Sequence, residues 1–251
     1  MRLTEAGRVL ASHVLTVLQD EERLQSELSA LAGIQRGGLS VVGVESTNED
    51  FLPVVLKQMA CHYPGVRIRT GSAVSSAMPA MIASGEVDIG LAYSLPPTRE
   101  LHKYASATFC VGAVVGPAHP LAARRRLSFA DCARHPLILP GPGMSTHESL
   151  KPFLVQARTP ASVLVETGSA GLMKKLAMRG LGVAFLAPLG LEAERNAGHL
   201  KFIALRTPLP MFAELGVYVR ASRALTPAIK VFLEITATHL AARERAEARL
   251  A

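Results

Sequence analysis

Between residues 39 and 92 the sequence alternates short apolar runs with segments of helical periodicity. The runs interpreted as strands are Leu39 to Val44, Val66 to Thr70 and Val87 to Ala92, of which the first and the last are mainly apolar. Segments 51–61 and 75–84 lie between them and carry apolar residues at helical spacing. Mainly apolar strands that alternate with helices are typical of a parallel sheet covered by helices on both faces. The sequence therefore predicts an α/β fold of the doubly wound class.

The same alternation of predicted strands and helices recurs in a second unit. Strands are predicted at 111–115, 137–139, 163–165 and 183–186, and helices at 128–133, 146–157 and 169–179. A last strand at 215–219 and a helix that Thr226-Pro227 begins then follow. We interpret this order as one lobe, 38–110 and 215–251, interrupted by an inserted second lobe, 111–214. Two chain crossings form a hinge, and the ligand cleft of such a protein lies between the lobes.

The first 36 residues have a different pattern. Apolar residues recur every seven positions at Leu3, Leu10, Val17, Leu24 and Leu31, and Val14 and Leu28 occupy the interleaved position. This heptad predicts a helix of about 30 residues, roughly 45 Å long, that Gly33 and Gly37-Gly38 end. We interpret it as a two-helix coiled coil between subunits. The alternative is a long helix packed on its own domain.

Composition narrows the partners and the compartment. The net charge of +7, from 27 Lys and Arg against 20 Asp and Glu, favours nucleic acid or an acidic small molecule, or describes a solvated basic surface. No apolar run is long enough to span a membrane, and the first residues do not form a signal peptide. The three cysteines are widely spaced, without a C-x-x-C motif. We therefore expect a cytoplasmic protein without a structural disulfide or a membrane partner.

Signatures of catalysis and of cofactor binding are missing from the sequence. Neither a nucleophile elbow, a P-loop nor a dinucleotide fingerprint occurs. His62 and His147 have no metal-ligand spacing with a Cys or a Glu. We expect no enzyme activity, no cofactor and no metal.

Eight short phrases, in order along the whole chain, resemble those of LysR-type transcriptional regulators. None is specific alone, but eight in the family's order and spacing are strong. They are Leu3-Thr4-Glu5-Ala6-Gly7, Gly38-Leu39, Phe51-Leu52-Pro53, Tyr63-Pro64-Gly65-Val66, Gly85-Glu86-Val87-Asp88-Ile89-Gly90, His119-Pro120-Leu121-Ala122, Gly180-Leu181-Gly182-Val183 and Leu225-Thr226-Pro227-Ala228.

The resemblance implies a two-lobe, periplasmic-binding-protein-like effector domain behind a coiled-coil linker helix, in a homodimer or homotetramer. It also implies a winged helix-turn-helix of about 60 residues at the N-terminus. The chain holds only the last phrase of that domain, so we expect residues 1–36 to be its remnant plus the dimerisation linker. We then expect DNA to bind only through the missing domain, as in a shortened gene or protein.

Three stretches rich in hydroxyl groups follow predicted strands and precede predicted helices. They are Ser46-Thr47-Asn48, Ser72 to Ser76, and Gly143-Met144-Ser145-Thr146. Free N–H groups and the helix dipole favour anions at such positions. Each stretch on its own also fits an ordinary helix cap. Their presence at the same kind of position in both lobes favours a binding site for a small-molecule effector.

The resemblance refines this candidate site. It implies effector contacts from Ser46, from Ser75 with Ser76 as the alternative register, and from Tyr93 at the end of the third strand. It further implies main-chain N–H groups from Gly143, Met144, Ser145 and Thr146, with Gly168-Ser169 a weaker candidate. No Arg stands in these loops. A carboxylate effector would thus depend on hydroxyl and N–H groups.

Two other functions fit the predicted two-lobe scaffold. A solute-binding protein of a transport system needs export, which the absent signal peptide and the heptad helix oppose. A cleft enzyme needs a convergent acid–base pair, and only Glu45, Glu49 and Asp50 lie near the predicted cleft. We therefore favour the effector-binding and oligomerisation region of a regulator, in which effector binding shifts the conformation that controls transcription.

Overall fold

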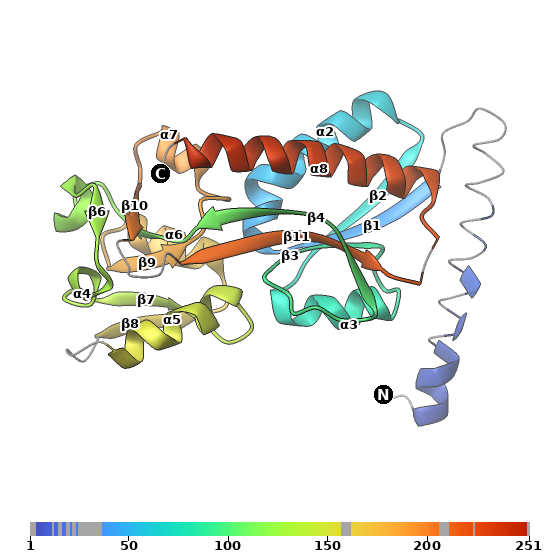
Figure 1. Ribbon diagram of the computed structural model, residues 1–251, viewed down its shortest axis with the longest axis horizontal. Coiled ribbons are helices and arrows are strands. Elements are labelled where there is room, and N and C mark those ends of the chain that lie inside the picture. The colour runs from blue at the N-terminus through green and yellow to red at the C-terminus, as the bar shows by residue number, and fades with distance from the viewer. Residues whose placement is uncertain are drawn as a thin grey trace.

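The computed structural model describes residues 4–11, 13, 14, 17, 18, 21, 24, 37–156, 162–205, 211–222 and 224–249. Two mixed β-sheets lie next to each other, each with its own helices (Figure 1). The chain passes from the first sheet to the second after β4 and returns to the first sheet at β11. We call the first sheet with its helices the first lobe, and the second sheet with its helices the second lobe.

The first sheet has the strand order β2-β1-β3-β11-β4. The strands are β1 (Gly37–Gly43), β2 (Val66–Ser72), β3 (Ile89–Tyr93), β4 (Leu101–Cys110) and β11 (Phe212–Arg220). β1 pairs in parallel with β2 and β3, as the sequence predicts. β11 pairs antiparallel with both β3 and β4, so the sheet is mixed rather than wholly parallel. β4 was not predicted, because it is an edge strand of mixed polarity with much of its length exposed.

Helices cover both faces of the first sheet. α2 (Leu52–His62) and α8 (Pro227–Ala248) lie over one face, and η2 (Ser75–Ala77) with α3 (Met78–Ala83) lies over the other (Figure 1). Successive side chains of a strand point to opposite faces of the sheet, so the first lobe has a hydrophobic core on each face. Val41 packs in the cluster that contains Phe232 of α8, and Val42 packs with Met78 of α3 on the other face.

α8 begins where the sequence predicts. The Thr226 hydroxyl accepts the N–H of Ile229 at 3.3 Å, and Pro227 takes the first helical position. The helix, coloured red, then runs along the first lobe towards α7 of the second lobe (Figure 1). Near its end, Arg195 of the second lobe pairs with Glu247 at 3.1 Å. α8 therefore links the two lobes outside the cleft.

The second sheet has the strand order β6-β10-β5-β9-β7-β8. Its strands are β5 (Gly112–Val115), β6 (Arg126–Leu127), β7 (Leu137–Pro140), β8 (Val163–Thr167), β9 (Val183–Leu186) and β10 (Lys201–Leu205). β7 is parallel to β8 and β9, and β5 is antiparallel to β9 and β10. The four strands predicted in this region are all present. β6 and β10 were not predicted; β6 has only two residues, and β10 is a short strand whose residues are mostly half-buried.

Short helices complete the fold. They are η1 (Thr47–Phe51), η3 (Pro120–Ala123), α4 (Phe129–Cys132), α5 (Ser145–Gln156), α6 (Ala170–Met178) and α7 (Glu192–Asn196). α4, α5 and α6 were predicted, with Ser128 and Ser169 as side-chain caps. α7 and η1 were not, since each is one turn of five residues. The domain bounds 38–110, 111–214 and 215–251 themselves stay a prediction.

The predicted linker helix lies only partly within the described residues. Residues 5–11, 13, 14, 17, 18, 21 and 24 are helical. Val9, Leu10, Val17 and Leu24 are more than half exposed. Leu3, Leu28 and Leu31 of the heptad fall outside the description, so the coiled coil stays a prediction. Among the described helices, none combines the length and apolar character that a membrane span requires.

Candidate functional site

A cavity of about 570 Å³ lies between the two lobes. Its walls come from the segments that follow β1, β2 and β3 in the first lobe and β7, β8 and β9 in the second lobe. The polar and charged side chains on the walls are those of Glu45, Ser46, Asn48, Glu49, Ser72, Ser75, Tyr93, Ser145, Thr146, Ser169 and Lys174. The size suits a small molecule.

Most of the residues predicted to bind the effector lie on the cavity wall. The structure places six there: Ser46, Ser75, Tyr93, Met144, Ser145 and Thr146. They meet because the carboxyl ends of neighbouring strands share one edge of a sheet, and the two edges face each other across the cleft. Their contact with an effector stays a prediction.

Three predicted residues do not line the cavity: Thr47, Ser76 and Gly143. The Thr47 side chain is fully buried, and its hydroxyl donates to the Val44 carbonyl at 2.7 Å. The Ser76 N–H donates to the Gly143 carbonyl at 3.3 Å, so these two residues contact each other across the lobes. Thr47 therefore stabilises a local turn, and Ser76 and Gly143 form a contact between the lobes, so none of the three faces the cavity.

Tyr93 supplies an unpaired hydroxyl group. The residue is 7% exposed, its N–H donates to the Ser75 hydroxyl at 3.2 Å, and its own hydroxyl has no hydrogen-bond partner among the described residues. Burial raises the pKa of the Tyr93 phenol; the nearby Ser46 hydroxyl, which forms no hydrogen bond of normal geometry with it, and the Arg243 charge only partly oppose that rise. The phenol therefore keeps its proton and can donate a hydrogen bond to a ligand.

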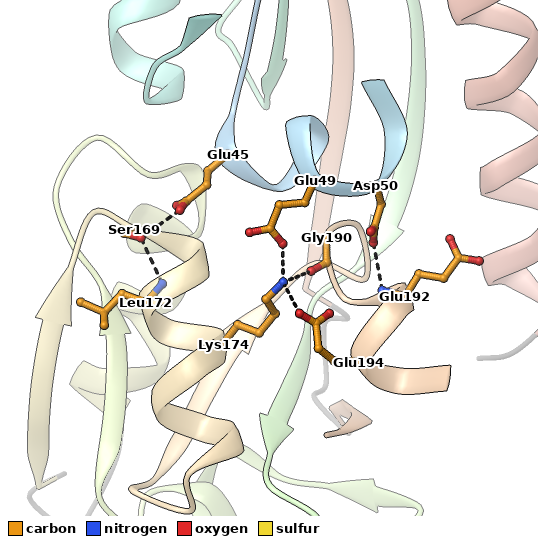
Figure 2. A network of polar contacts seen from close by, with 9 residues as sticks. All are labelled: Glu45, Glu49, Asp50, Ser169, Leu172, Lys174, Gly190, Glu192 and Glu194. Carbon is orange, nitrogen blue, oxygen red and sulfur yellow. Dashed lines mark hydrogen bonds and ion pairs between the residues drawn. The ribbon is translucent and has the colours of Figure 1, made fainter. Parts of the chain in front are cut away.

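Lys174 on α6 is a cation on the cavity wall that the sequence analysis missed. Its side chain is 6% exposed and forms ion pairs with Glu49 of the first lobe and with Glu194, the latter at 2.8 Å. It also donates to the Gly190 carbonyl at 2.8 Å (Figure 2). The available signal was periodicity: Gly171, Lys174 and Ala177 share the buried face of α6.

The two carboxylates control the charge of Lys174. Burial disfavours the ammonium, but the hydrogen bonds that Lys174 donates to Glu194 and Glu49 outweigh this effect and raise the pKa of Lys174. Burial also acts to raise the pKa of Glu194, yet the bond with Lys174 lowers it overall. Lys174 and Glu194 therefore carry their charges together in the folded protein.

Three acidic side chains of one segment, residues 45–50, reach from the first lobe to the second (Figure 2). Glu45 accepts from the Ser169 hydroxyl at 3.1 Å, and Glu49 pairs with Lys174. Asp50 accepts the N–H of Glu192 at 2.9 Å, at the start of α7. Ser169 caps the N-terminus of α6, and Glu192 begins α7. The N-terminus of a helix favours a nearby carboxylate such as Glu45 or Asp50. We call these contacts the acidic bridge. The sequence analysis placed its members near the cleft without their partners.

A metal site has no support in the described part of the chain, where no group of three or more His, Cys, Asp or Glu residues could hold a metal ion. The polar groups of the cavity are mainly hydroxyl groups and carboxylates. That arrangement suits recognition of a polar ligand by hydrogen bonds.

Comparison with known proteins identifies the class of this fold. The family model of the LysR substrate binding domain matches residues 32–241. The chain belongs to this family, whose domain is the effector-binding part of LysR-type transcriptional regulators. The predicted resemblance and the two-lobe α/β fold are thereby confirmed.

Several individual relatives are regulators by name. The chain is 26% identical over 238 residues to the HTH-type transcriptional regulator CbbR of Rhodospirillum rubrum, which covers 94% of this chain and 78% of the relative. It is 30% identical over 244 residues to CbbR of Xanthobacter flavus, with 93% and 71% covered. The solved effector-binding domain of QuiR in complex with shikimate has the same fold, with a TM-score of 0.69, 11% identity and coverage of 82% and 98%.

Proposed function

We propose that this chain is the effector-binding and oligomerisation region of a LysR-type regulator and binds a small polar molecule in the interlobe cavity. The observation that carries the proposal is the Tyr93 hydroxyl, which is buried on the cavity wall without a partner among the described residues. A buried, unpaired hydroxyl costs free energy until a ligand satisfies it. The relative with the same fold, QuiR, binds shikimate.

Ligand binding affects the relative position of the two lobes, which the acidic bridge also connects. A ligand between the lobes contacts Ser46 and Tyr93 on one side and Ser145 and Thr146 on the other. It therefore stabilises one relative position of the lobes over others. In a regulator, that change of position is the signal that controls transcription. The lobes in this proposal are residues 38–110 with 215–251, and residues 111–214.

A thermal-shift screen of small carboxylates, aromatic compounds, sugars and amino acids tests the proposal. A ligand at 100 times its Kd stabilises the folded state by about 2.7 kcal/mol, which raises the Tm by roughly 5 °C or more in a chain of this size. Tyr93→Phe keeps the ring and removes only the unpaired hydroxyl. We expect this variant to fold as stably as the wild type and to lose part of the ligand-induced shift.

Two further variants complete this test. Tyr104→Phe is the matched control, since Tyr104 is 37% exposed on β4 and lies outside the cavity. Ser46→Ala should reduce the ligand response as Tyr93→Phe does. Equal responses of the wild type and of Tyr93→Phe and Ser46→Ala to every ligand that binds would place binding elsewhere.

We also propose that the N-terminal helical residues associate with a second copy of the chain. Val9, Leu10, Val14, Val17, Leu18 and Leu24 are exposed in the single chain, which supports an apolar surface for such contact. Light scattering of the purified chain should give at least a dimer, and deletion of residues 1–32 should weaken it. A monomeric full chain would contradict the proposal.

A homo-oligomeric regulator of this kind acts in the cytoplasm.

A further inference from the structure

The charges on the cavity wall restrict which effector can bind. Among the described lining residues, the carboxylates are those of Glu45 and Glu49, and the one ammonium is that of Lys174. Lys174 already donates to Glu49, to Glu194 and to the Gly190 carbonyl, which uses all three of its N–H donors. These described lining residues therefore leave no cation for a ligand anion, and their side chains carry a net negative charge; the Arg243 charge acts on Tyr93 from outside the lining.

Glu45 is the carboxylate without a cation. Within the described residues its one hydrogen bond comes from the Ser169 hydroxyl to Oε1, at 3.1 Å. The same oxygen lies 2.7 Å from where a Cβ of Gly171 would be, so it sits on the first turn of α6 (Figure 2). The other oxygen, Oε2, has no hydrogen bond from a described residue. Glu45 is half-buried, so this oxygen is open to solvent or to a ligand in the cavity.

A ligand in the cavity removes solvent from Glu45. A carboxylate that loses solvent without gaining a donor destabilises the complex strongly. An ammonium group meets this need best, because it brings both a compensating charge and charge-assisted hydrogen bonds. A ligand with two or more negative charges is repelled, since the lining side chains already carry a net negative charge.

A second set of groups on the wall consists of uncharged donors. Ser145 and Thr146 begin α5, a helix of 12 residues, and their N–H groups belong to the first turn, which has no intrahelical acceptors. The buried Tyr93 hydroxyl adds a donor without a partner in the described chain. Such a set binds one carboxylate without the need for a cation.

From these two sets we propose that the effector is a small zwitterion of the amino-acid class. Its ammonium group binds to Glu45, and its carboxylate binds to the start of α5 and to Tyr93. This inference rests on the proposed function, which requires only that some small molecule binds in the cavity. It adds the class of ligand and makes Glu45 the residue that selects it.

Titration calorimetry of the full chain tests the class of ligand. The panel contains free amino acids, the same compounds without the amino group, dicarboxylates and neutral polyols. We expect an amino acid to bind, and its deaminated partner to bind at least about tenfold more weakly, since a hydrogen bond to a charged group is lost. Glu45→Gln should weaken amino-acid binding about tenfold or more and narrow the gap between the two partners.

A matched control variant sharpens the result. Glu86→Gln makes the same change at an exposed site of the first lobe outside the cavity and should leave affinity unchanged. The comparison of each amino acid with its deaminated partner uses the wild-type chain, so it tests the inference even if Glu45→Gln folds poorly.

Three results would overturn the inference: no amino acid binds, a deaminated acid or dicarboxylate binds at least as tightly, or Glu45→Gln leaves amino-acid affinity unchanged. The proposed function fails separately, and only if the acids, dicarboxylates and polyols of the same panel do not bind either.

Discussion

Lys174→Met is the substitution with the largest predicted effect on stability. The side chain of Lys174 is 6% exposed, and its ammonium lies between Glu49, which is 35% exposed, and Glu194, which is 23% exposed. Methionine retains most of the aliphatic stem and removes the charge and its three donors. The two carboxylates and the Gly190 carbonyl then lose their common partner.

The magnitude follows from the exposure of the partners. Removal of one member of a buried ion pair costs about 3–5 kcal/mol, since the remaining charge stays uncompensated. Here both glutamates keep contact with solvent, which screens their charges and reduces the loss. We therefore expect Lys174→Met to lower the free energy of unfolding by about 2–3 kcal/mol.

Urea denaturation followed by circular dichroism measures this loss. The matched control is Lys175→Met, because Lys175 is the next residue of the same helix and is exposed. We expect the control to lie within about 0.5 kcal/mol of the wild type. A Lys174→Met variant as stable as its control would refute the reasoning that the ion pairs stabilise the cleft.

The same pair predicts a pH dependence. The pKa of Glu194 is lowered from its ordinary value of 4.5 in the folded protein. Its contribution to stability is therefore fully present above pH 4.5 and is lost as the pH falls through the lowered pKa. Lys174→Met removes this contribution. Between neutral pH and pH 3 the variant should lose less stability than the wild type, and parallel curves would contradict the assignment.

Three further predictions test other parts of the fold. Thr226→Ala removes the hydroxyl cap of α8 and should cost about 1 kcal/mol in urea denaturation, whereas no change would show that the cap is not used. Gly182→Ala would place a Cβ 2.2 Å from the Pro136 carbonyl oxygen, so the backbone must shift and the Tm should fall by several degrees; an unchanged Tm would contradict that contact. Iodoacetamide at pH 8 should modify the exposed Cys61 and spare Cys132, because burial raises the pKa of the Cys132 thiol to about 12; equal labelling in mass spectrometry would contradict this.

Burial explains which strands the sequence could predict. Strands such as Val183–Leu186 are covered on both faces, so every residue is apolar and the run is visible without a structure. β4 has exposed positions along its length, and its polar residues obscure the strand pattern. β10 was missed although four of its five residues are apolar. The mainly buried β1 and β3 were predictable for the same reason as β9, whereas β2 alternates largely between half-buried and exposed residues. The antiparallel insertion of β11 between β3 and β4 was not predictable.

Some residues of the candidate site could likewise be predicted from the sequence, and others could not. Ser46 and Ser75 could be placed near the cleft because they follow strands whose ends share one sheet edge, and Tyr93 was implied by the family resemblance. The pairing of Lys174 with Glu49 could not, since these residues are 125 positions apart and belong to different lobes. No local pattern marks such a partner, because its position depends on how the two sheets face each other.

By itself the sequence determined the family, the order of the two lobes and the hydroxyl-rich loops at the cleft. The family follows from the resemblance of eight short phrases, and the other two features follow from local rules: strand and helix periodicity, helix caps and turns. The tertiary structure decided the charge of the cleft. It brought Glu45, Glu49 and Asp50 against α6, Lys174 and α7, and it left the Tyr93 hydroxyl without a partner in the described chain. Charge acts through space rather than along the chain, so only the packed lobes reveal which groups remain for a ligand.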